Sequence, residues 1–213
     1  MIAYATLLHP DTPTAVLDEA WAEVCARHGW TWRPVGRQVR RDIVPTLAVW
    51  HWPGDTSTAE SLGRKWARNE GASNVSSHCG IDETGVVWYA GPHMRTNHAA
   101  GHNTHTLGLD ICVPVLVRDK ANAERRGVYV GDRVWTSETM PNGGRHRHHI
   151  LDLDPHVAAA CGTLRRAVDE ELAGLRWVDH MHVDPNRKPD CGPWRNDLAA
   201  HGAHDLFQTG ETT

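Results

Sequence analysis

Three residues of this 213-residue chain have the types and the setting that a catalytic zinc ion requires. Such an ion takes three protein ligands from His, Asp, Glu and Cys and leaves a fourth position for water. His51 ends the apolar run in TLAVWHWPG, while His180 and Asp190 lie ten residues apart in HMHVDPNRKPDC. Because the chain has 16 histidines, three ligands can also be chosen by chance. The pattern predicts a candidate zinc site, and an ordinary polar loop stays the alternative.

Two further residues have the chemistry of a proton shuttle and of a positive charge beside such a site. Asp110 is the one charged residue of the apolar run TLGLDICVPVLV, and a carboxylate in a buried strand needs a reason. A hydrolytic metal site needs a proton shuttle besides its ligands, which makes Asp110 the candidate. Lys188 precedes Asp190 by two residues, so alternation along an extended segment brings both side chains to one pocket.

The elements that must position these residues follow from hydrophobic periodicity and from turn and capping residues. The patterns predict three helices and three longer strands: helices over 12–29, 57–71 and 154–175, strands over 46–54, 106–117 and 176–184. Ser57 and Glu60 have capping-box spacing, and Glu83-Thr84-Gly85 indicates a hairpin. Residues 118–150 are polar and are expected to form an irregular surface excursion. We expect one α/β domain with a central mixed β-sheet flanked by α-helices.

Composition limits the classes of function. With 40% hydrophobic and 23% charged residues, the chain should fold as one globular domain. The formal charge of −4 gives no basic field for a polyanion, so nucleic acid is not the expected partner. Five scattered cysteines without a CxxC pair argue against a disulfide framework and favour a reducing cytoplasm.

The N-terminal run MIAYATLLHPDTP has no basic segment, and no apolar run approaches the ~20 residues of a membrane helix. We therefore expect no signal peptide and no membrane partner. A monomer is the expected state, although no sequence feature bears on it. The expected division is an N-terminal helix and connection (1–45), a catalytic domain (46–195) with a surface insertion (118–150), and a polar tail (196–213).

Four stretches together resemble a known family, the zinc-dependent N-acetylmuramoyl-L-alanine amidases of type 2. This family shares its fold with peptidoglycan recognition proteins and includes many phage endolysins. AVWHWPG resembles the strand that ends in the first zinc ligand, and SHCGIDETGVVWYAGP resembles the hairpin. NHAAGHNTHTLGLDI resembles the His-Ala-x-Gly-x-Asn run with its following strand, and HMHVDPNRKPDCGP resembles the closing ligand loop. The four stretches span residues 46–194, about 70% of the chain, in the family's order.

The resemblance implies three zinc ligands, which are His51, His180 and Asp190. It assigns Lys188 to the developing oxyanion, and it places Asp110 where the subgroup with an Asp ligand has a catalytic Glu. Ser77 stands where another subgroup has a tyrosine. Because a serine cannot replace a phenol, the resemblance favours the carboxylate route through Asp110.

The chain also departs from the family's pattern. Asp110 is one methylene shorter than Glu, and the 118–150 insertion has no family counterpart that we can name. His182 stands where the family usually has Asp, which creates a rival ligand pair of His182 with Cys191. The pair His180 and Asp190 is preferred because Lys188 keeps its register with them.

Three more polar residues match family positions in the hairpin and in the following loop. His98 and Asn103 are expected to border the cleft, where contact with the muramyl peptide is weighed evenly against a structural role. For His78, a structural role in the hairpin is preferred.

The implied reaction is hydrolysis of the amide between N-acetylmuramic acid and L-alanine of peptidoglycan, with Zn²⁺ as cofactor. The expected setting is a phage endolysin that waits in the host cytoplasm and acts on the cell wall after release. The alternatives are a cytoplasmic amidase that recycles muropeptides and an inactive peptidoglycan-binding module. Nucleic-acid binding through RQVRR and RHRHH is the remaining reading, and the negative charge argues against it.

Overall fold

The computed structural model describes most of the chain in eight segments: 4–35, 39–40, 44–53, 56–68, 77–99, 102–136, 147–184 and 191–205. Its strands are β1 (Thr31–Trp32), β2 (Val39–Arg40), β3 (Leu47–His51), β4 (Cys79–Asp82), β5 (Gly85–Trp88), β6 (Met94–Arg95), β7 (Thr106–Ile111), β8 (Asp132–Thr136), β9 (Arg147–Leu151) and β10 (Arg176–Asp179). Its α-helices are α1 (Thr14–Arg27), α2 (Ala59–Arg68), α3 (Lys120–Arg126), α4 (Pro155–Glu171), α5 (His180–Val183) and α6 (Arg195–Ala200). Three 3-10 helices complete the list: η1 (Tyr4–Leu7), η2 (Val117–Asp119) and η3 (Gly192–Trp194).

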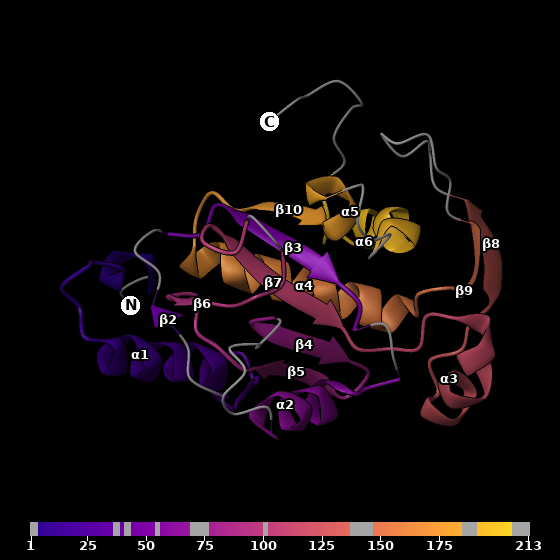
Figure 1. The fold of residues 1–213 in the computed structure, drawn as a ribbon, viewed down its shortest axis with the longest axis horizontal. Helices are drawn as coiled ribbons and strands as arrows, with labels where there is room; N and C mark the ends of the chain where they lie inside the picture. Colours follow the sequence, from indigo (N-terminus) through magenta and orange to yellow (C-terminus); the bar gives the residue numbers. More distant parts are fainter. Residues whose placement is uncertain are drawn as a thin grey trace.

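Six strands form a central mixed sheet in the order β1-β5-β4-β7-β3-β10 (Figure 1). Within it, β4 and β5 pair antiparallel as the predicted hairpin, and all other pairs are parallel. Four neighbouring strands, β4, β7, β3 and β10, therefore end at the same edge of the sheet. The expected α/β class with a central mixed sheet flanked by helices is confirmed.

The two faces of the sheet differ because side chains alternate along each strand. Trp50 and Trp177 lie on one face and pack with residues of α4 in the main hydrophobic core. Figure 1 shows α4 lying across these strands. His51 and Asp110 follow Trp50 and Leu109 by one residue, so they lie on the opposite face. That face carries the candidate site.

Helix α4 begins as the sequence predicts. The Asp154 carboxylate accepts hydrogen bonds from the backbone N–H groups of His156 and Val157, and Pro155 is the first helical residue. This capping satisfies two of the amide groups that a helix start leaves without partners.

The capping box predicted for α2 is wrong by one residue. Thr58 and Ser61 form it, because each accepts a hydrogen bond from the other's backbone N–H through its hydroxyl oxygen, at 3.1 and 2.8 Å. The Glu60 carboxylate instead accepts hydrogen bonds from Arg33 and Arg64. The hydroxyl pair is equivalent in geometry to the expected Ser/Glu pair, so the sequence allowed both registers.

The N-terminal segment packs into the same core as the rest of the chain. Strand β1 extends the sheet beside β5, and α1 buries Trp21, which contacts Trp88 edge to face with ring centroids 4.7 Å apart. The Tyr4 hydroxyl hydrogen-bonds to Nδ1 of His93, and the Tyr4 backbone N–H donates to Glu171 at 2.9 Å. These contacts link the start of the chain to α4 and to the loop before β6.

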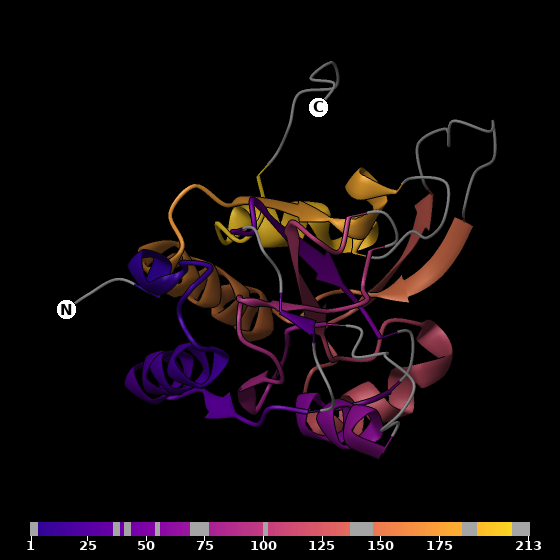
Figure 2. The ribbon, with the colours of Figure 1, turned by 60° about the vertical axis from the view of Figure 1, so that its left-hand side comes forward.

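The predicted irregular excursion over 118–150 is corrected, because its described residues are structured. They contain α3 and the strands β8 and β9, which pair antiparallel. Figure 2 shows β8 and β9 projecting from the body of the protein (Figure 2). Ile150 and Leu151 of β9 are buried in the main core, which explains why a segment of polar composition is held against the domain.

The residues after Trp194 are also more structured than the polar tail that the composition predicts. Helix α6 buries Leu198 against α4, and the Trp50 indole N–H donates to the backbone oxygen of Ala203 at 2.7 Å. The Asp205 carboxylate accepts from the backbone N–H of Trp177 at 2.7 Å. The chain is therefore part of the domain up to at least Asp205, and 206–213 lie outside the described residues.

No helix among the described residues is both long enough and apolar enough to cross a membrane.

Candidate functional site

Three neighbouring parallel strands bring His51, Asp110 and His180 to one edge of the sheet. His51 is the last residue of β3 and pairs in register with Asp110 of β7. His180 follows β10 directly, and its ring centroid lies 4.7 Å from that of His51. All three side chains are buried. Crevices at the carboxyl ends of parallel strands are common ligand sites in α/β proteins.

A chain of hydrogen bonds fixes the tautomer of His51. The hydroxyl of Thr106 donates to the backbone oxygen of His102 at 2.8 Å, so Nε2 of His98 is the donor to Thr106 Oγ1 at 2.9 Å. Nδ1 of a neutral His98 is then the acceptor from Nε2–H of His51, at 3.1 Å. This direction leaves the lone pair of His51 on Nδ1, the electronic state that a metal ligand needs.

The His98 ring can lie beside His51 because the residue that packs under the His98 ring is a glycine. A β-carbon at Gly108 of β7 would collide with the His98 ring. The backbone N–H of Gly108 donates to Nδ1 of the buried His78 at 3.0 Å, and Nε2 of His78 donates to the backbone oxygen of Met94 at 2.9 Å. His78 therefore has the structural role expected for it, and it supports the strand on which His98 rests.

The carboxyl group of Asp110 is oriented by Ser77. The Ser77 hydroxyl donates to Oδ2 of Asp110 at 2.6 Å, and both side chains are buried. The sequence singled out Ser77 only as a missing tyrosine. In the fold, its hydroxyl restricts the rotation of the Asp110 carboxyl group, and Asp110 pairs in register with His51.

The residue before His180, the buried Asp179, anchors the start of α5. The Asp179 carboxylate accepts from Nε of Arg195 at 2.6 Å and lies 3.1 Å from Nε2 of His204, and it also caps α5 through the backbone N–H of His182. Burial raises the pKa of this carboxyl, but the hydrogen bonds from His204 and Arg195 outweigh burial and hold the pKa at about 2. Asp179 is therefore ionised at neutral pH.

We expect Asp179→Ala to lower the free energy of unfolding by about 3 kcal/mol, because it leaves the buried His204 and the partly buried Arg195 without their anion. Urea unfolding followed by circular dichroism measures this loss. Asp184→Ala, just beyond α5, is a matched control and should change stability by less than about 0.5 kcal/mol. Equal stability of the Asp179 variant and wild type would contradict the anchoring role.

The geometry does not favour the rival ligand pair, His182 with Cys191. His182 is half-buried, and its charged neighbours include Asp179, Arg195 and His204. Burial lowers the pKa of His182. Cys191 packs in the main hydrophobic core, where it begins η3 with a positive φ of 57°. His180, and not His182, is the histidine that lies against His51.

The structure describes only some of the other predicted site residues. Lys188 and Asp190 lie outside the described residues. Among the residues that are described, no three His, Cys, Asp or Glu side chains are grouped closely enough to hold a metal ion. The side chain of Asn103 accepts from the backbone N–H groups of His98 and Ala99, so it shapes its own loop. His98 points toward His51 and is a positioning residue in this geometry.

The buried thiols near the site are not nucleophiles. All five cysteines are buried. Burial raises the pKa of Cys79 and of Cys112 well above the usual range. Because the thiolate is the reactive form, both stay inert at neutral pH.

The chain has the fold of the type 2 N-acetylmuramoyl-L-alanine amidases and the peptidoglycan recognition proteins. The catalytic domain of XlyA is similar with a TM-score of 0.52 at 12% identity, over 82% of this chain and 97% of that domain. A mutant endolysin from Bacillus subtilis gives a TM-score of 0.53 at 12% identity, over 82% of this chain and 97% of the endolysin. The N-acetylmuramoyl-L-alanine amidase LysC from Clostridium intestinale is 13% identical, over 79% and 96% of the two chains, with a TM-score of 0.47. No protein-family model and no curated protein matches this sequence.

Proposed function

We propose that this protein is a zinc-dependent N-acetylmuramoyl-L-alanine amidase, which hydrolyses the amide between N-acetylmuramic acid and L-alanine in peptidoglycan. One observation carries the proposal. His51, His180 and Asp110 meet at the ends of three adjacent parallel strands in the fold of such amidases. Fold alone does not imply function, so the argument rests on this grouping of two imidazoles and a carboxylate.

The donor set fits zinc. His51 presents a neutral imidazole with its lone pair on Nδ1, as the chain through His98 and Thr106 requires. His180 is the second imidazole, and Asp190 is the proposed third ligand. Two neutral histidines and one carboxylate form a common ligand set for catalytic zinc. When bound, zinc polarises the scissile carbonyl and lowers the pKa of water toward ~7.

The protein's own residues supply the proton transfer. Asp110 accepts a proton from the attacking water and passes it to the alanine nitrogen as the amide bond breaks. Ser77 restricts the rotation of the Asp110 carboxylate by its 2.6 Å hydrogen bond. Lys188 is proposed to face the oxyanion that develops on the carbonyl oxygen, an electrostatic contribution of roughly 3 kcal/mol in comparable sites.

The proposed biological setting is host lysis by a phage endolysin acting on intact walls. One of the structures of similar fold is described as an endolysin, which supports this choice over recycling. A recycling amidase cleaves the same bond in soluble muropeptides, and an inactive binding module cleaves neither substrate. Comparing intact sacculi with soluble muropeptides separates these alternatives.

The direct test measures metal content, loss of turbidity and new N-terminal alanine on purified peptidoglycan, for wild type and for Asp190→Ala. One zinc per chain, released alanine amines, and loss of both in the variant are the expected results. Zinc without alanine release, on sacculi and on soluble muropeptides, would rule out the amidase and leave a binding module.

We expect His98→Ala to weaken zinc binding by about tenfold to a hundredfold, because the ring that fixes the His51 tautomer is lost. Competition with a chelator of known affinity measures this change. His105→Ala is the control, since that ring lies in the same loop, where it contacts the ring of His102. If both variants bind zinc equally well, His98 does not position the ligand.

A further inference from the structure

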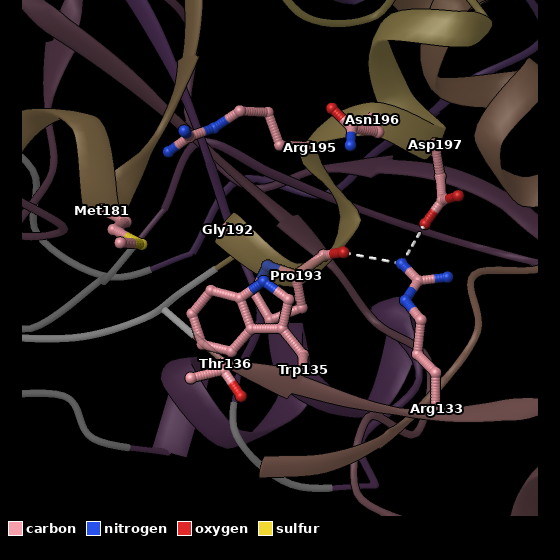
Figure 3. Close-up of a pocket in the computed structure, with 9 residues that line it drawn as sticks. All are labelled: Arg133, Trp135, Thr136, Met181, Gly192, Pro193, Arg195, Asn196 and Asp197. Atoms are coloured by element: carbon pink, nitrogen blue, oxygen red, sulfur yellow. Dashed lines mark hydrogen bonds and ion pairs between the residues drawn. The ribbon is translucent and has the colours of Figure 1, made fainter. Parts of the chain in front are cut away.

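A pocket of about 400 Å³ lies between the β8–β9 hairpin and the elements that follow the candidate site (Figure 3). Trp135 and Thr136 of β8 form one wall, and Met181 of α5 and Asn196 of α6 lie across from them. Pockets of this size accept small ligands. The hairpin belongs to the 118–150 insertion, for which the resemblance offers no counterpart.

The pocket begins beside the candidate site. Met181 directly follows His180 and lines the pocket. Figure 1 shows β8 and β9 beyond the edge at which β3 and β7 end, the same edge that carries His51. A polymer held at His51 and His180 could therefore continue into this pocket.

Arg133 fixes the hairpin in place. Its guanidinium donates to the Asp152 carboxylate, to the backbone oxygen of Pro193 at 2.6 Å and to the Asp197 carboxylate at 2.7 Å. Figure 3 shows the last two of these bonds on the far side of the pocket from Met181. Three hydrogen bonds from Arg133 thus attach this wall of the pocket to the residues around α6, and they form without a ligand.

The charges around the pocket are compensated. Arg133 is paired with Asp152 and Asp197, and the other lining cation, Arg195, is paired with the buried Asp179. Both arginines among the described lining residues are therefore already paired with carboxylates. The pocket therefore suits a neutral, polar ligand better than an anionic peptide.

A flat aromatic surface and an exposed amide group complete the lining. Trp135 is half-buried, with its ring edge over Gly192, and it lies nearly parallel to His148, with ring centroids 6.3 Å apart. In the part of the chain that the structure describes, the exposed side chain of Asn196 forms no hydrogen bond. An aromatic face with a nearby amide group matches a sugar ring, which has apolar C–H faces and a polar edge.

We propose that this pocket is a saccharide subsite that binds an N-acetylhexosamine unit of the glycan strand, next to the muramyl unit whose amide is cleaved. The inference rests on the proposed amidase function for the identity of the polymer. The general ligand chemistry, a neutral sugar with an apolar face, follows from the pocket, and the N-acetyl group follows from the proposed polymer.

The kinetic test compares two soluble substrates, a muramyl peptide with one sugar and a muramyl peptide within a tetrasaccharide. Trp135→Ala should lower kcat/KM by about tenfold on the tetrasaccharide and leave the single-sugar substrate unchanged. Asn196→Ala should act in the same direction by about fivefold. Val134→Ala is the matched control, because Val134 is exposed on the opposite face of β8 and should alter neither substrate.

A binding test separates this inference from the amidase proposal. The β-1,4-linked N-acetylglucosamine tetramer has no scissile amide, and its binding is followed by calorimetric titration. Wild type and Val134→Ala should bind it, and Trp135→Ala should bind at least about tenfold more weakly. This result would support the subsite even if wild type hydrolysed no muropeptide.

Two outcomes would overturn the subsite while leaving the amidase intact. In the first, Trp135→Ala binds the tetramer as wild type does and keeps full kcat/KM on the tetrasaccharide. In the second, Trp135→Ala loses activity equally on both substrates, which would assign the pocket to the peptide stem.

Discussion

Asparagine at position 110 is expected to lower amide hydrolysis by about two to four orders of magnitude, the range of general acid–base catalysis. The side chain keeps its volume and can still accept the hydrogen bond from Ser77. It can no longer take a proton from water at neutral pH. Because Asp110 is not a proposed ligand, the Asp110→Asn variant should retain one zinc per chain. Release of N-terminal alanine from soluble muropeptides, measured beside metal content, checks both statements.

Two further variants test whether the loss of activity comes from the Asp110 carboxylate itself. Ser77→Ala removes only the group that orients the carboxylate, so its loss should be about tenfold and its zinc content unchanged. Asp110→Glu restores a carboxylate one methylene longer and should recover part of the rate. If Asp110→Asn turned over at the wild-type rate, the proton would have to move through another group, and Asp110 would leave the mechanism.

The sequence was sufficient to predict how the strands present His51 and Asp110. His51 ends an apolar run with strand propensity, and Asp110 lies within another such run, so both were expected on buried strands. The Asp154 cap and the Glu83-Thr84 hairpin were predictable for the same reason, since each depends on neighbours within a few residues. Local patterns therefore specified the strands that carry His51 and Asp110, whereas their parallel pairing came from the structure.

Features that depend on distant contacts were not predictable. His98 matched a loop expected to border the cleft, and only the packing of its ring over Gly108 turns it toward His51. The polar segment after Trp194 is part of the domain because Ala203 accepts a hydrogen bond from Trp50, more than 150 residues earlier. The hairpin wall depends in the same way on the pairing of Arg133 with Asp197. Each partner lies too far along the chain for a sequence pattern to indicate the contact.

The two histidines of α5 provide the second decisive test. His180→Ala is expected to weaken zinc binding by more than about a hundredfold and to abolish hydrolysis, because it removes one of three proposed ligands. His182→Ala should keep one zinc per chain and most of the activity. Chelator competition gives the affinities, and urea unfolding with a chelator present confirms that both variants fold.

The two variants can be compared directly because His180 and His182 are two residues apart on one short helix and have different neighbours. His180 lies against the ring of His51 at 4.7 Å, whereas His182 lies near Asp179, Arg195 and His204. A general disturbance of α5 would affect both variants alike, while loss of a ligand affects one. Zinc lost from His182→Ala and kept by His180→Ala would instead favour the pair His182 and Cys191. That result would require Cys191 to leave the hydrophobic core in which its side chain now packs.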